Sequence, residues 1–141
     1  MSVIPISERK IPTILSVGDS EQFIIGDKAL ESGIEGITSV LSFKEIVGHS
    51  DAEYARDNRF WIAPKGSSKG SLILSAKKAT EEFLKLLLGE YTDGEIPDSW
   101  IVGQPAISDE NWLKNYRKHI RAALMSFGHQ SVEFYPEPFA V

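Results

Sequence analysis

The segment between residues 108 and 128 constrains the fold most, because its apolar side chains repeat with the period of an α-helix. At about 100° per residue, seven of them fall within one arc of about 120°. Ser108 stands where a helix would be capped, and Gly128 stands where it would end. The pattern predicts a helix over about 109–127 with one face packed on the domain. The arc consists of Trp112, Leu113, Tyr116, Ile120, Ala123, Leu124 and Phe127.

A stripe of positive charge begins where this apolar arc ends. The spacing i, i+3, i+4, i+7 places its four members on one side of the helix. No acid lies between Asn111 and Val132, although the chain has a net charge of −5. Two interpretations remain open: a site for an anionic ligand or acidic partner, or a solvated face whose long side chains cover the edges of the core. The cationic stripe consists of Lys114, Arg117, Lys118 and Arg121.

Composition indicates one globular domain. The chain has 141 residues, of which 42% are hydrophobic, and this is enough for one sizeable core. It contains no cysteine, so disulfides, thiolate metal sites and cysteine nucleophiles are excluded. Residues 1–5 lack the pattern of a signal peptide, and no apolar run is long enough to span a membrane. We therefore expect a soluble, cytoplasmic protein.

Turn and strand patterns predict an α+β fold. Two hairpins are expected, one over 13–25 and one over 59–74, and short strands at 100–102 and 132–135. The apolar pattern after Ser75 predicts a second helix over about 75–88. Residues 27–48 fit either a strand that breaks near Lys44 or a helix, and we favour the strand. We expect a single domain with an antiparallel or mixed sheet, packed by two main helices at about 75–88 and 109–127.

The loop over residues 64–70 and the histidines are the candidates for chemistry. Lys65 and Lys69, between glycines, suit phosphate binding, although a hairpin tip has the same composition. The loop lacks the helix that must follow a Walker A motif or a nucleophile elbow. His49 and His119 are candidate acid/base groups, but spacing identifies no partner for either. We expect no metal site and no cofactor.

The ends of the chain and its charge distribution favour association with other proteins. Residues 1–12 and 136–141 are expected to form proline-bearing, apolar arms. Net acidic segments (1–53 and 89–110) alternate with net basic ones, so copies of the chain can attract each other. The first hypothesis is a non-catalytic assembly protein, self-associating or bound to another protein through the arms and the cationic stripe.

Two other hypotheses involve a small ligand. In the second, Arg117 and Arg121 grip a nucleotide or phosphorylated metabolite, and Lys65 or Lys69 closes over it. In the third, a small enzyme acts on such a ligand. The acidic net charge and the lack of a recognition motif argue against nucleic acid, and we expect no membrane partner.

Overall fold

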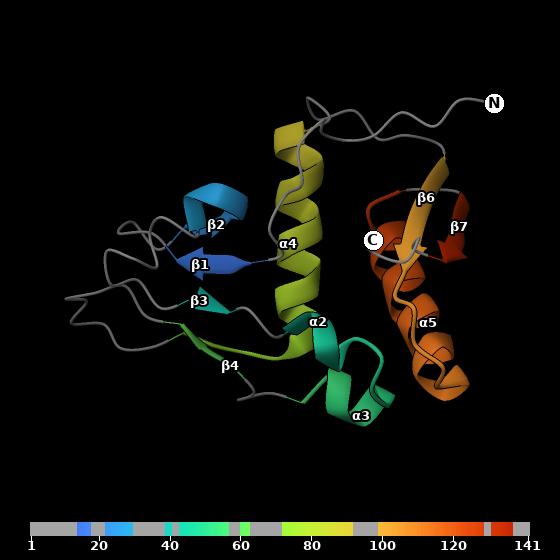
Figure 1. Cartoon of the computed structure of the whole chain (residues 1–141). Helices are drawn as coiled ribbons and strands as arrows, with labels where there is room; N and C mark the ends of the chain where they lie inside the picture. The colour runs from blue at the N-terminus through green and yellow to red at the C-terminus, as the bar shows by residue number, and fades with distance from the viewer. Residues whose placement is uncertain are drawn as a thin grey trace.

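The computed structural model describes residues 14–17, 22–29, 39–40, 43–56, 60–62, 72–91, 99–128 and 131–136. The fold is α+β, as expected, with small sheets and two long helices (Figure 1). The predicted N-terminal arm lies outside the described residues, as does the C-terminal arm after Pro136. The elements are β1 (Leu15–Val17), β2 (Phe23–Ile25), β3 (Ser39–Val40), α2 (Phe43–Ile46), α3 (Asp51–Tyr54), β4 (Phe60–Ile62), β5 (Leu72–Leu74), α4 (Ala76–Tyr91), β6 (Ser99–Gln104), α5 (Glu110–Ser126) and β7 (Ser131–Pro136).

Both predicted hairpins are present as antiparallel pairs. β1 pairs with β2, with Leu15 opposite Ile25, and β4 pairs with β5, with Trp61 opposite Ile73. β3 joins the other side of β1, which makes a three-stranded sheet of order β2-β1-β3. The ambiguous segment 27–48 therefore contains both a short strand and a helical turn, because α2 begins only three positions after β3 ends.

The two C-terminal strands form a separate parallel pair. β6 and β7 run side by side with Trp100 opposite Val132, and α5 connects them. A parallel pair needs a long crossover, usually a helix, so this is a βαβ unit. The described strands are thus divided among three small sheets, where a single sheet was expected.

Local hydrogen bonds define the ends of the two long helices. At the start of α4, the Ser75 hydroxyl oxygen accepts a hydrogen bond from the Lys78 amide at 3.0 Å. This helix continues through Gly89 to Tyr91, beyond the expected end. In α5 the cap is Asp109, not Ser108. Its carboxylate accepts hydrogen bonds from the backbone amides of Asn111 and Trp112. A carboxylate is also favoured there by the helix dipole. Gly128 follows the helix with φ of 97°, as expected for a helix stop.

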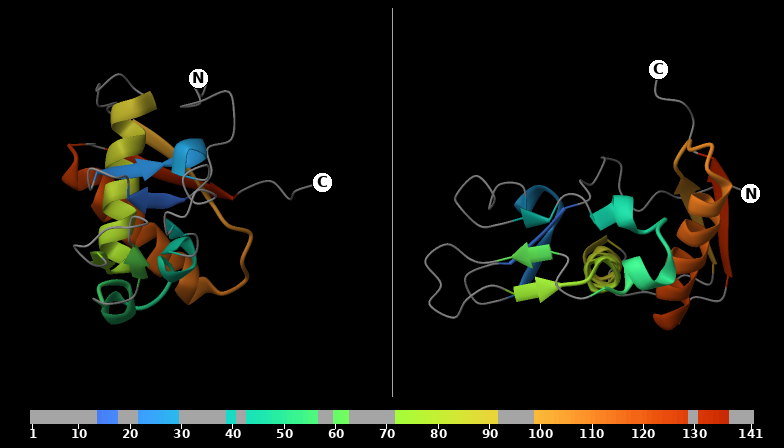
Figure 2. Two further views of the ribbon diagram at one scale, coloured as in Figure 1. Left: turned by 90° about the vertical axis from the view of Figure 1, so that its left-hand side faces the viewer. Right: turned by 90° about the horizontal axis from the view of Figure 1, so that it is seen from below.

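Helix α4 lies between the two halves of the molecule. Figures 1 and 2 show the antiparallel strands on one side of it and the α5, β6 and β7 unit on the other. A first hydrophobic cluster joins β1, β2, β5 and α4 around Leu15 and Phe83. A second cluster joins α2, α3, α4, α5 and β7 around Val47, Tyr116 and Leu124. None of the helices in the described segments has both the length and the apolar character that a membrane-spanning helix requires.

Candidate functional site

The cationic stripe lies on α5 beside the apolar face of the helix, and its four members have different surroundings. Lys118 turns toward α3, where its ammonium lies 2.6 Å from the Asp51 carboxylate. Both side chains are largely exposed, at 58% and 66%. Water screens an ion pair of this kind, so it adds little to the stability of the fold.

Arg117 and Arg121 turn toward the parallel strands. Arg117 donates a hydrogen bond to the side-chain oxygen of Gln104 at 3.1 Å. Arg121 donates to the backbone oxygen of Val132 at 3.4 Å, and its guanidinium carbon lies 5.2 Å from the centre of the Phe134 ring. Both arginines therefore hold α5 against β6 and β7, and none of these partners carries a negative charge.

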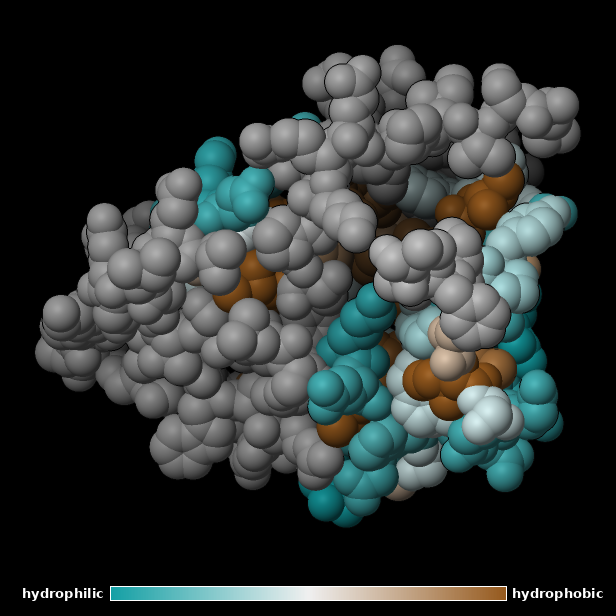
Figure 3. Space-filling model, viewed as in Figure 1, coloured by the Kyte–Doolittle hydropathy of each residue, from teal (hydrophilic) through white to brown (hydrophobic). Residues whose placement is uncertain are grey.

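Lys114 is the exposed member nearest the start of the helix, and it contacts no acid among the described residues. Of the four members of the stripe, only Lys118 has an acidic partner among the described residues. The stripe therefore presents three positive charges that no described carboxylate neutralises. Lys65 and Lys69, the other residues expected to contribute, lie outside the described residues. In the view of Figure 3 the described surface is largely hydrophilic, with separate hydrophobic areas.

A buried histidine links α5 to the segment before it. His119 Nδ1 lies 2.6 Å from the Val47 carbonyl oxygen, and Nε2 lies 2.8 Å from the Asp51 carboxylate. Its ring stacks on Tyr54, with the ring centres 3.9 Å apart. Only the protonated imidazolium can donate both hydrogen bonds at once. Because both nitrogens are engaged within the protein, His119 offers no free nitrogen as a general base.

Two groups that contact His119, Asp51 and Tyr54, have shifted pKa values. The hydrogen bond from Lys118, followed by that from His119, lowers the pKa of the Asp51 carboxyl below its ordinary value of 3.8. Burial raises the pKa of the Tyr54 hydroxyl to about 12. A cavity of about 440 Å³ lies beside this group, lined by residues of α3, α4 and α5. Its lining carries both signs of charge, from Asp51 and Glu81 as well as from two lysines, so it does not select an anion.

The sequence contains no local signal for the Asp51–His119 pair. Sixty-eight positions separate the two residues, and only the packing of α3 against α5 brings them together. The capping box at Ser50 was a usable signal for α3 itself, since the Ser50 hydroxyl accepts a hydrogen bond from the Glu53 amide at 3.3 Å. In the part of the chain that the structure describes, no group of three or more acidic or histidine side chains could hold a metal ion.

Comparison with known proteins assigns no family to this chain. No protein-family model matches the sequence, and no curated protein matches it. The function must therefore be inferred from the surfaces of the molecule itself.

Proposed function

We propose that this protein is a non-catalytic assembly protein, and that the cationic stripe of one copy contacts the acidic segment of a second copy. One observation carries the proposal. Within the described residues, Lys114, Arg117 and Arg121 form a row of positive charge on a rigid helix without a single acidic partner. A row of one sign attracts an anionic partner and disfavours cationic ones.

The length of the row favours an acidic chain segment over a small anion. With a rise of 1.5 Å per residue, Lys114 and Arg121 are about 10 Å apart along the helix axis. A single phosphate cannot contact both ends of such a row, whereas several carboxylates along a chain can. Residues 89–110 contain acids and no lysine or arginine, so the chain itself carries a segment of the required charge. Four of these acids lie close together in the first part of the segment: Glu90, Asp93, Glu95 and Asp98.

The terminal arms form the second part of the proposal. Residues 1–12 and 137–141 contain prolines and apolar side chains, which suit packing against a neighbouring copy once charge has brought the copies together. The proposal places the assembly in the cytoplasm, a setting that a chain without cysteine suits.

Light scattering coupled to size-exclusion chromatography tests self-association. We expect an oligomer at low ionic strength that dissociates as salt is added, because salt screens exposed charges. Lys114→Glu should weaken association about fivefold or more, since it reverses one exposed contact. The matched control is Lys85→Glu, the same change at an exposed position of α4. Lys114 is preferred to Arg117 and Arg121, which also hold β6 and β7.

A charge exchange identifies the acidic partner. Glu90→Lys alone should weaken association, and the double variant Lys114→Glu/Glu90→Lys should recover part of the loss. A protein that stays monomeric at low salt, with or without residues 137–141, would overturn the proposal. If phosphate or nucleotides instead raise the melting temperature of a monomer, and Lys114→Glu removes that effect, the small-anion hypothesis replaces it.

A further inference from the structure

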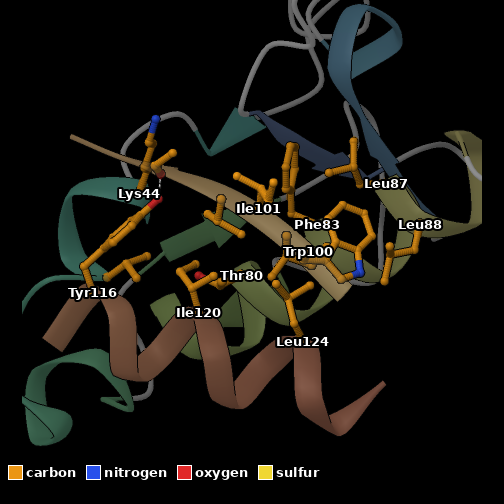
Figure 4. A pocket seen from close by; sticks show the side chains of 14 residues that line it. Lys44, Thr80, Phe83, Leu87, Leu88, Trp100, Ile101, Tyr116, Ile120 and Leu124 are labelled. Carbon is orange, nitrogen blue, oxygen red and sulfur yellow. Dashed lines mark hydrogen bonds between the residues drawn. The ribbon is translucent and has the colours of Figure 1, made fainter. Parts of the chain in front are cut away.

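An apolar cavity lies between α4 and the α5 and β6 unit, against the apolar side of α5. Its volume is about 290 Å³. Side chains of α4, α5 and β6 line it, together with Lys44 of α2 and Val47 (Figure 4). This volume lies near the lower end of the range of small-molecule pockets, which are mostly apolar with a few polar groups.

The cavity is suited to an apolar occupant rather than to water. Its described lining is dominated by aliphatic and aromatic side chains such as Phe83, Trp100 and Leu124. The two lining hydroxyl groups both donate to backbone oxygens, Thr80 to Ala76 at 2.8 Å and Tyr116 to Gly103 at 3.1 Å. Water needs two to four polar partners, and apolar cavities without them stay dry.

A single charge stands at the rim. Among the described lining residues Lys44 alone is charged, and no described acid pairs with it. Figure 4 shows Lys44 and Tyr116 at one end of the cavity and Trp100 with Leu88 at the other. The ammonium points away from the apolar side chains, and the flexible lysine stem lets it meet a group placed at the opening.

We propose that this cavity binds a small amphipathic acid, with the apolar body between α4, α5 and β6 and the carboxylate beside Lys44. At about 30 Å³ per non-hydrogen atom, the volume of one water, the cavity has room for about ten such atoms. A cavity of about 150 Å³ accommodates benzene, so a chain or ring system of this size is reasonable. The proposal does not depend on self-association, because it uses a different surface and a different lysine.

An NMR titration with three ligands of equal chain length tests the proposal: octanoate, 1-octanol and octylamine. Octanoate has ten non-hydrogen atoms and one carboxylate. We expect saturable binding of octanoate and octanol, with octanoate tighter by about fivefold through its contact with Lys44, and octylamine weakest. The amide signals of Thr80, Leu84, Gly103 and Ile120 should shift most.

Two variants separate the body of the site from its charge. Leu87→Trp should fill the cavity and weaken octanoate binding at least about tenfold, whereas Met125→Trp, on the exposed side of α5, should leave it unchanged. Lys44→Glu should weaken octanoate about fivefold and leave octanol unchanged, and Lys85→Glu should affect neither.

The outcomes that overturn the proposal are equally specific. Absence of saturable binding of all three ligands would do so, as would unchanged binding in Leu87→Trp or signal shifts scattered over the surface. If circular dichroism shows Leu87→Trp to be unfolded, the proposal is tested by two other results. These are the affinity of Lys44→Glu for octanoate and the positions of the shifted amide signals in the wild-type protein. Equal affinity of octanoate for the wild-type protein and for Lys44→Glu would overturn the assignment of the acid.

Discussion

At Gly48 the packing of α5 leaves no room for a side chain. Gly48 is buried, and a methyl group added to it would overlap the indole ring of Trp112. The same turn receives two hydrogen bonds from α5: Trp112 Nε1 donates to the Glu45 oxygen at 3.4 Å, and Asn115 donates to the Gly48 oxygen at 3.2 Å. The absence of a side chain at Gly48 therefore lets the start of α5 approach the turn.

We expect Gly48→Ala to lower the free energy of unfolding by about 1–3 kcal/mol, because the indole ring must move from its place. Urea denaturation followed by circular dichroism measures the change. The cause is tested by repeating the substitution in a Trp112→Ala background, where the overlap is gone and the cost should largely disappear. An equal cost in both backgrounds would show that the ring is not responsible.

The carboxyl of Asp51 makes a second residue-level prediction, concerning pH. Its pKa in the folded protein is lowered by Lys118 and then by His119, below the ordinary 3.8. A lowered pKa stabilises the fold above the unfolded value and loses that effect as the pH falls through the folded value. We therefore expect the wild-type protein to lose its advantage over Asp51→Asn as the pH drops below 3.8.

Urea midpoints for both proteins, measured between about pH 6 and about pH 2.5, test this expectation. Lys118→Met should remove the larger part of the same pH dependence, because its hydrogen bond is the first cause of the shift. A difference between wild type and Asp51→Asn that stays constant across the range would contradict the assignment.

At the scale of elements, α4 shows how local preference and tertiary packing compete. Gly89 is a good helix stop by local preference, yet the helix continues through it to Tyr91. Just before it, Leu88 is buried in the second hydrophobic cluster. Contacts of this kind are what hold a helix turn against the preference of a single residue.

Gly89→Ala should therefore stabilise the protein by about 0.5–1 kcal/mol, because alanine loses less backbone entropy in a helix. A new methyl group meets no atom within 4 Å at this position, so no packing penalty offsets the gain. Thermal unfolding measures it. A lower melting temperature would contradict the assignment of Gly89 to the interior of a regular helix with open space around it.

The βαβ unit shows what could be predicted from the sequence and what could not. The strand at 100–102, the long helix and the strand at 132–135 were each predicted, because each depends on local periodicity. Their parallel pairing could also have been inferred, since a helix between two strands favours it. The separation of the parallel pair from the antiparallel strands depends on how α4 packs between them, which no local pattern records.

The candidate site was predictable to a similar degree. Spacing placed Lys114, Arg117, Lys118 and Arg121 on one face of a helix, and all four positions lie within α5. Their separate partners, Asp51 on one side and Gln104 and Val132 on the other, belong to different elements. These contacts follow from tertiary packing, so the sequence alone did not indicate them.

For the whole molecule, α4 is the element on which both halves depend. Ala79 and Phe83 belong to the first hydrophobic cluster, Ala76 and Leu88 belong to the second, and Leu84 packs against both. Because both clusters contain residues of α4, unfolding of this helix disrupts both of them. The molecule therefore has the arrangement of a cooperative unit, although its sheets are small and separate.

The second cluster also has a consequence for how the chain is made. Val47 and Tyr54 are synthesised long before Leu124 and Val132, which complete their surroundings. The first cluster draws on residues from Leu15 to Leu87 and can close much earlier. Until residue 132 has left the ribosome, the nascent chain holds α2, α3 and one side of α4 without their cover, and exposed apolar surface of this kind promotes aggregation. The interval between the synthesis of α4 and the completion of β7 is therefore the period in which this apolar surface is exposed.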